Sequence, residues 1–117
     1  YGGNPLACAV GAKVVEILTA PGFLDDVNRK AALLRQGLEG LVATNPQAFD
    51  QVRGAGLMLG LHCVAPNTDI VKAAQAAHLL TVPAADNVIR LLPPLTITDS
   101  DIADALARLE HAAKSVT

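Results

Sequence analysis

The chain has 117 residues, a formal net charge of -2, and 51% hydrophobic against 17% charged residues, which fits one apolar-rich domain. Its 9 lysines and arginines are spread out instead of forming a basic stripe, and its apolar runs are too short for a membrane span, so neither a nucleic-acid nor a membrane partner is expected. The composition predicts a soluble, cytoplasmic protein.

The first predicted element is a helix over about residues 5–19. Asn4 followed by Pro5 is typical of a helix start, because the asparagine side chain caps the first turn and proline lacks an N–H that would be unpaired there. Apolar residues then recur on one face as far as TAPGF: Leu6, Val10, Val14, Ile17 and Leu18. The glycines of YGGN before this helix could favour a phosphate, but an ordinary tight turn is the simpler interpretation.

A second amphipathic helix follows, and the TNP segment at residues 44–46 ends it. The residues that keep its helical period are Val27, Ala31, Leu34, Leu38 and Leu41. Charged residues lie toward water on the remaining faces: Asp25, Asp26, Arg29, Lys30 and Arg35.

The helical period fails in QVRGAGLMLGLHCV, residues 51–64, where glycines interrupt an apolar run. We interpret this segment as strands at Val52–Arg53 and Leu57–Val64, or as one kinked strand. Its glycines could let the backbone approach a ligand, although glycines in strands more often mark a bulge or close packing.

The remaining segments predict a helix, a hairpin and a final helix. Residues 66–80 form an alanine-rich helix with Asn67 or Thr68 as its N-cap, and residues 79–94 form an antiparallel pair about a turn at residues 84–87. Thr98 with Asp101 resembles a capping box. The apolar face of the final helix consists of Ile102, Leu106, Leu109 and Ala113. The fold class is therefore α+β: helices on one face of a small, mostly antiparallel sheet, with a protruding N-terminal helix.

Arg90 is the strongest candidate for a binding residue. On a strand it shares a face with Val88 and Leu92, while Ile89 and Leu91 take the other. An unpaired guanidinium buried there would cost several kcal/mol, so an anion is expected beside it. Arginine suits a carboxylate, which it binds through two parallel hydrogen bonds. The pattern supports a bound carboxylate and a structural salt bridge to Asp86, Asp99 or another acid about equally.

The cysteines and histidines give no further site. Cys8 and Cys63 lack the spacing of a metal or redox motif, so neither a disulfide nor a metal is expected. The three histidines, at positions 62, 78 and 111, are too scattered for a local metal motif.

Three segments together, YGGNPLACAVG, VRGAGLMLGL and NVIRLLPPLTITDSDI, resemble the C-terminal part of class III (ornithine-aminotransferase-like) pyridoxal-phosphate aminotransferases. The likeness covers essentially the whole chain. Within that family, RLLPPLTIT with the short GLMLGL strand looks most like the acetylornithine branch, although the ornithine, succinylornithine and 4-aminobutyrate enzymes share the same blocks.

This resemblance implies a fold-type I homodimer in which pyridoxal phosphate forms a Schiff base with a lysine upstream of Tyr1. None of the chain's own lysines, at positions 13, 30, 72 and 114, matches that lysine, so the chain alone is expected to be inactive and to bind no cofactor. By this resemblance, residues 1–22 are a turn and helix that connect to the large domain, and residues 23–117 form the C-terminal small domain.

The resemblance also implies roles for single residues. Arg90 matches the arginine that binds the α-carboxylate of the amino donor and of 2-oxoglutarate, in a transamination of N-acetylornithine that belongs to arginine biosynthesis. Tyr1, Gly2 and Gly3 match the stretch beside a hydroxyl residue that reaches the cofactor phosphate of the neighbouring subunit. Two alternatives remain: a stand-alone, non-catalytic α+β module for ligand binding or assembly, and a folded but inactive proteolytic or expression product.

Overall fold

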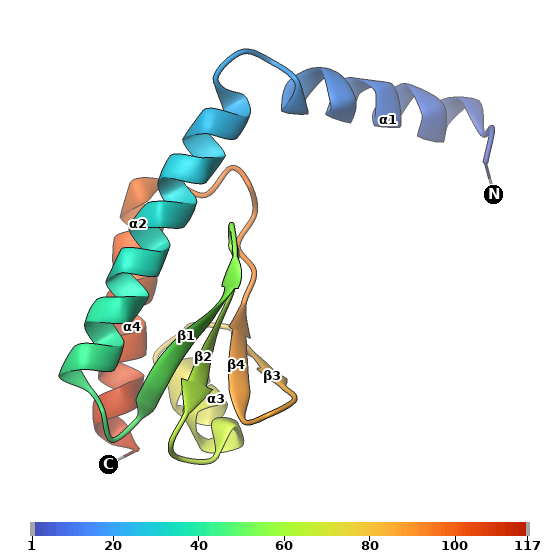
Figure 1. Cartoon of the computed structure of the whole chain (residues 1–117). Helices are drawn as coiled ribbons and strands as arrows, with labels where there is room; N and C mark the ends of the chain where they lie inside the picture. Colours follow the sequence, from blue (N-terminus) through green and yellow to red (C-terminus); the bar gives the residue numbers. More distant parts are fainter. Residues whose placement is uncertain (1, 117) are drawn as a thin grey trace.

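The computed structural model describes residues 2–116, and within them four helices and four strands follow one another (Figure 1). In chain order they are α1 (Pro5–Leu18), α2 (Phe23–Thr44), β1 (Phe49–Ala55), β2 (Met58–Cys63), α3 (Asn67–Ala76), β3 (Val82–Ala84), β4 (Val88–Leu91) and α4 (Asp99–Ser115). The predicted α+β class is confirmed.

The four strands form one antiparallel sheet in the order β1-β2-β4-β3. The prediction of two strands, at Val52–Arg53 and Leu57–Val64, is confirmed with different bounds, and the alternative of one kinked strand was wrong. β1 begins earlier, at Phe49, and pairs with β2 as a hairpin around Gly56, whose φ of 57° allows the tight turn. The predicted antiparallel pair about residues 84–87 is confirmed as β3 and β4.

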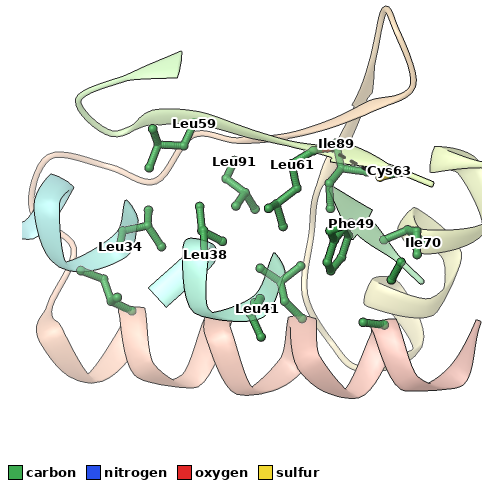
Figure 2. Packing of buried hydrophobic residues seen from close by; sticks show 14 of the residues in the cluster. Leu34, Leu38, Leu41, Phe49, Leu59, Leu61, Cys63, Ile70, Ile89 and Leu91 are labelled. Atoms are coloured by element: carbon green, nitrogen blue, oxygen red, sulfur yellow. Dashed lines mark hydrogen bonds between the residues drawn. The ribbon is translucent and has the colours of Figure 1, made fainter. Parts of the chain in front are cut away.

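One face of the sheet carries the core. Leu59 lies opposite Leu91, and Leu61 opposite Ile89, so these four side chains point to the same side. Figure 2 shows them meeting leucines of α2 and Ile70 of α3. Helix α4 adds its apolar face to the same cluster, through Ile102, Leu109 and Ala113. The helices therefore cover one face of the sheet, and the amphipathic patterns predicted for α2 and α4 are confirmed.

Two predicted helix starts are confirmed and one was wrong. The Asn4 side chain accepts hydrogen bonds from the first turn of α1, and Thr98 and Asp101 form a reciprocal capping box at α4. Helix α3 has Pro66 at its N-cap position, without a side-chain cap.

Asn67 does not act as the N-cap because its side chain is hydrogen-bonded to the β3–β4 hairpin. Its Nδ2 donates to the carbonyl oxygens of Ala84 and Val88, both at 3.0 Å. The Asn67 backbone N–H donates in turn to Oδ1 of Asn87, at 2.8 Å. Asn87 has a left-handed φ of 52°, which asparagine tolerates well. These bonds fix the β3–β4 turn against α3.

Helix α1 protrudes from the rest of the chain (Figure 1), and none of its residues is buried. Leu6 is 74% exposed and Val10 is 56% exposed, so its apolar face lacks a partner among the described residues. Within residues 2–116, no single helix is long and apolar enough to cross a membrane, and α1 with α2 meets that test only as a pair bent by 70°.

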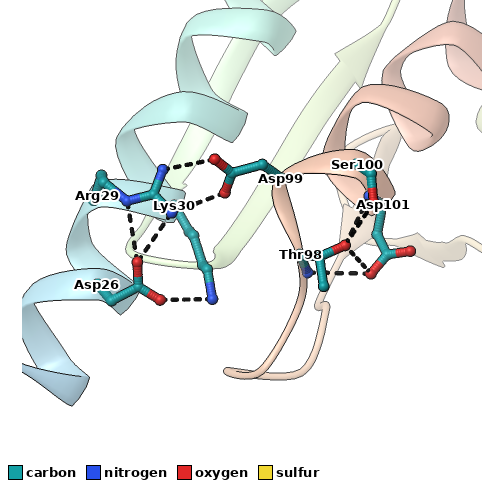
Figure 3. Close-up of polar contacts among 7 residues, drawn as sticks. All are labelled: Asp26, Arg29, Lys30, Thr98, Asp99, Ser100 and Asp101. Carbon is teal, nitrogen blue, oxygen red and sulfur yellow. Dashed lines mark hydrogen bonds and ion pairs between the residues drawn. The ribbon is translucent and has the colours of Figure 1, made fainter.

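Charged side chains join the start of α4 to the start of α2 (Figure 3). Arg29 donates to both carboxylate oxygens of Asp99, at 2.9 and 2.8 Å, and to Asp26 at 3.0 Å. Lys30 lies 2.6 Å from Asp26. These hydrogen bonds lower the pKa of Asp99, chiefly through Arg29, and of Asp26, through Lys30 and then Arg29. Both carboxylate oxygens of Asp99 are therefore occupied by hydrogen bonds from Arg29 of α2.

We expect the free energy of unfolding to fall as the pH drops below about 4. The carboxyls of Asp26, Asp86, Asp99 and Asp101 all have pKa values below the ordinary 3.8 because of their hydrogen bonds. The stability that they contribute is present above 3.8 and is lost as the pH falls through the lowered values. Thermal unfolding midpoints measured from about pH 6 to pH 2 test this, and Asp99→Asn should give a shallower decline. A decline as steep as that of the unmodified chain would contradict the assignment to Asp99.

Candidate carboxylate-binding site

The sheet face opposite the helices, here called the open face, carries one row of residues across all four strands. Arg53 of β1 lies opposite Gly60 of β2, Gly60 lies opposite Arg90 of β4, and Arg90 lies opposite Val82 of β3. Directly opposed residues of antiparallel strands point to the same face. The two arginines therefore flank a glycine on the same surface.

Arg90 is exposed, whereas its neighbours Ile89 and Leu91 are buried in the core on the other face. The predicted division of this strand into two faces is confirmed. The guanidinium emerges from the strand instead of being buried with it, as this division into two faces predicts. Strand alternation places it in water, where an unpaired charge has no large desolvation cost.

Neither of the acids named as candidate salt-bridge partners binds Arg90. Asp99 pairs with Arg29, and Asp86 pairs with Arg53. In the part of the chain that the structure describes, Arg90 makes no ion pair. The other arginines all have acidic partners: Arg29 with Asp26 and Asp99, Arg35 with Glu39, Arg53 with Asp86, and Arg108 with Asp104. Arg90 is therefore available to an external anion.

A shallow depression of about 230 Å³ lies on the open face between the two arginines. Its lining includes Arg53, Gly60, Met58, Val88 and Arg90. A Cβ on Gly60 would come within 2.7 Å of Val88 Cγ1, so a side chain there would displace Val88 from this surface. The floor is apolar and small, with a cation on each side, and it suits a small anion with a carbon chain.

A larger cavity of about 320 Å³ lies on the helix side and is almost wholly apolar. Its lining includes Leu34, Leu79, Leu91, Pro93 and Ile97. Asp101 is the acid in its wall, and its carboxylate is committed to the capping box with Thr98. The lining of this cavity therefore has no charged side chain that is free to bind a ligand. The open face remains the candidate site.

Sequence reasoning missed several polar contacts made by strands β1 and β2. Arg53 contacts Asp86 in the β3–β4 turn, and its Nε donates to Gln51 at 2.8 Å. His62 Nδ1 lies 2.6 Å from Asp50. The Arg53 guanidinium lowers the pKa of the Asp86 carboxyl through a hydrogen bond and its charge. Recognising the hairpin at Gly56 would have placed Arg53 level with Arg90.

The predicted cofactor-binding stretch lies far from Arg90. Gly2 and Gly3 are exposed at the outer end of α1, which points away from the sheet (Figure 1). Tyr1 lies outside the described residues. The Asn4 side chain already accepts from the N–H groups of Leu6 and Ala7, at 3.0 and 3.3 Å. The described residues do not by themselves form a site that fits pyridoxal phosphate.

The cysteines are separate and unpaired with each other. Cys8 is exposed on α1 and Cys63 is buried in the core. Burial raises the pKa of the Cys63 thiol to about 11, which keeps it protonated and unreactive near neutral pH. Across residues 2–116, no group of three His, Cys, Asp or Glu side chains could hold a metal ion.

Comparisons with known proteins agree with one another. The family model for aminotransferase class III matches residues 1–113. The chain is 66% identical over 116 residues to the acetylornithine aminotransferase of Rhodobacter capsulatus, and 43% identical over 112 residues to that of Bacillus subtilis. These matches cover 99% and 96% of the chain, but only 30% and 29% of the length of the two relatives.

Solved structures share the fold. N-acetylornithine aminotransferase from Stenotrophomonas maltophilia matches 97% of the chain and 32% of its own length, with a TM-score of 0.86 and 35% identity. Ornithine aminotransferase from Toxoplasma gondii matches 97% of the chain and 28% of its own length, with a TM-score of 0.84 and 28% identity. Because the family model covers nearly the whole sequence, this chain belongs to the class III aminotransferases.

Proposed function

We propose that this chain is the C-terminal part of an enzyme that transfers the amino group of N-acetylornithine to 2-oxoglutarate, and that Arg90 binds the substrate α-carboxylate. Three relatives that are 66%, 53% and 49% identical to this chain carry the name acetylornithine aminotransferase, which supports this branch of the family. The observation that carries the role of Arg90 is its exposed, unpaired guanidinium on a face where the neighbouring acids are committed to other partners.

In this proposal Arg90 orients the substrate. Its planar guanidinium can form two parallel hydrogen bonds with a carboxylate, which fixes the carboxylate plane as well as its position. A substrate held in one orientation reacts faster because less freedom is lost at the transition state. Its position on β4, whose other face is locked into the core by Ile89 and Leu91, keeps the base of the side chain rigid.

Class III aminotransferases use pyridoxal phosphate, which when bound supplies an electron sink for the amino acid carbon. We assign its lysine and most of its phosphate contacts to the rest of the enzyme, because the described residues do not fit the cofactor alone. Residues 1–22 then act as the connecting turn and helix, and residues 23–117 as the small domain. The exposed apolar residues of α1 support this division, since they need a covering partner.

We further propose that the enzyme is a cytoplasmic homodimer, as expected for its fold type. The stand-alone module is the weaker alternative. A self-sufficient domain has little reason to expose a whole apolar helix face, as α1 does with Leu6, Val10 and Val14.

The direct test is an assay of the full-length protein loaded with pyridoxal phosphate. Glutamate formation from 2-oxoglutarate is measured with N-acetylornithine, succinylornithine, ornithine and 4-aminobutyrate as donors. We expect the highest kcat/KM with N-acetylornithine. If another donor gives the highest kcat/KM, the enzyme belongs to the branch of that donor. If none of the four donors supports glutamate formation, the proposed function is wrong.

A further inference from the structure

Two asparagines tie the turn between β3 and β4 to the segment that joins β2 to α3. Both N–H groups of the Asn87 amide donate to carbonyl oxygens of that segment, to Cys63 at 2.5 Å and to Ala65 at 3.0 Å. The amide oxygen of Asn87 accepts from the backbone N–H of Asn67, at 2.8 Å. The Asn87 backbone carbonyl accepts from the Cys63 N–H, at 2.9 Å. Asn87 therefore holds the turn against the end of β2.

Asn67 holds the same turn from the first residue of α3. Its side-chain amide donates to the carbonyl oxygens of Ala84 and Val88, both at 3.0 Å. Ala84 ends β3 and Val88 begins β4, so one amide bridges the two strands across their turn. Both asparagines donate to carbonyl oxygens, which a carboxylate in the same place could not do. The network therefore requires amides at both positions.

Strand β4 relies on these bonds because it is short. It has four residues, and β3 on its outer side has three. Pro83 of β3 lies opposite Ile89 and has no N–H to donate across the pair. The prolines that follow β4, Pro93 and Pro94, have none either. Bonds that fix the beginning of such a short strand therefore have a large share in holding it in place along its axis.

We propose that Asn67 and Asn87 are positioning residues for substrate binding: they fix β4 along its axis and so set the point at which Arg90 meets the substrate carboxylate. This inference rests on the proposed role of Arg90. Arg90 lies three positions after Asn87 on an extended strand, about 10 Å away. A shift of the turn is therefore passed on to the guanidinium, and a binding group must stay within about 0.5 Å of its productive position. The bonds act on the backbone of β4, so they have this effect whichever group pairs with Arg90 before substrate binds.

The test uses the full-length, cofactor-loaded enzyme with Asn67→Ala and Asn87→Gly. Alanine is a good helix former, so the first change preserves α3. Glycine readily adopts the φ of 52° found at residue 87, so the second preserves the turn. We expect each change to raise KM for both substrates about three- to tenfold, with a smaller change in kcat.

A double-mutant cycle shows whether the asparagines act through Arg90. In an enzyme that already carries Arg90→Ala, Asn87→Gly should raise KM by less than about twofold, because the side chain that it positions is gone. If the full effect of Asn87→Gly persists without the guanidinium, the asparagine acts on the site by another route and the proposal is overturned.

Thr98→Ala is the matched control for lost stability. It removes a hydrogen-bonding side chain at the start of α4, where Thr98 Oγ1 accepts from the Asp101 N–H at 3.1 Å, and it changes nothing in the β3–β4 turn. The thermal midpoint should fall in all three variants, but KM should rise only in the two asparagine variants. An equal rise of KM in Thr98→Ala would assign the effect to stability and overturn the positioning role.

Hydrogen exchange of the enzyme without substrate gives a readout that needs no activity. We expect the backbone amides of residues 88–91 to exchange faster in both asparagine variants than in Thr98→Ala. Unchanged exchange there, or unchanged KM, in both asparagine variants overturns the proposal. If Arg90→Ala leaves KM unchanged, the proposed role of Arg90 itself fails. A rise in Arg90→Ala without one in the asparagine variants removes only the positioning role.

Discussion

Replacing Arg90 with alanine should raise KM for both N-acetylornithine and 2-oxoglutarate about tenfold or more in the full-length enzyme, each tenfold being about 1.4 kcal/mol. Both substrates carry an α-carboxylate, so one lost guanidinium affects both halves of the reaction. The loss is expected to be large because no other described arginine is free to replace it. Arg53 is the nearest by register, and it is held by Asp86.

Two further variants make this prediction specific. Arg90→Lys keeps the charge but loses the two-pronged geometry, so its KM should lie between those of the original enzyme and Arg90→Ala. Arg108→Ala removes an arginine that donates to the Ala77 carbonyl from α4, the helix layer on the opposite side of the sheet from Arg90. The Arg108→Ala variant should have a lower free energy of unfolding but unchanged KM values. Unchanged KM values in Arg90→Ala would make Arg90 an ordinary surface residue.

Much of the fold was predictable because its signals are local. Apolar periodicity located α2 and α4, and cap residues such as Asn4 and Thr98 marked where helices begin. Strand alternation alone assigned Arg90 to the face opposite Ile89 and Leu91. Each of these signals is contained within a few neighbouring residues, so a single sequence is enough to read them.

What the sequence did not reveal depends on pairs that lie far apart along the chain. Arg53 and Asp86 are 33 positions apart, and their contact follows only once the register of three strands is known. Asn67 looked like an N-cap because its type and position before a helix suit one, but the carbonyls of β3 and β4 compete for its side chain. Local chemistry gives such residues several possible partners, and only the folded sheet selects among them.

The hairpin in the middle of the chain was the segment predicted least well, and it determines the geometry of the open face. Its turn sets Arg53 opposite Gly60 and thereby level with Arg90. Two glycines of the RGAGLMLG stretch, Gly54 and Gly56, have structural roles. Gly54 packs closely against β2 and Gly56 forms the turn, which confirms the interpretation as close packing.

Gly54→Ala should lower the free energy of unfolding by about 3 kcal/mol or more, because it combines backbone strain with a steric clash. Gly54 has a φ of +104°, a conformation that side chains strongly disfavour. A Cβ there would lie 2.2 Å from the Met58 carbonyl oxygen and 3.1 Å from the Leu59 Cα. Both are backbone atoms, so no rotation of a side chain relieves the contact. The Arg35 hydrogen bond to the Gly54 carbonyl, at 2.5 Å, would shift with it.

Two matched glycine substitutions separate these causes in equilibrium urea unfolding followed by circular dichroism. Gly56→Ala, at a φ of 57° with no atom near its Cβ position, tests the strain alone and should cost about 1 kcal/mol. Gly40→Ala lies in the exposed interior of α2 with open space around it, and should stabilise the chain by about 0.5–1 kcal/mol. If Gly54→Ala costs no more than Gly56→Ala, the two strands are not held as closely as the structure places them. Such a result would also contradict the pairing that places Arg53 in the same row as Arg90.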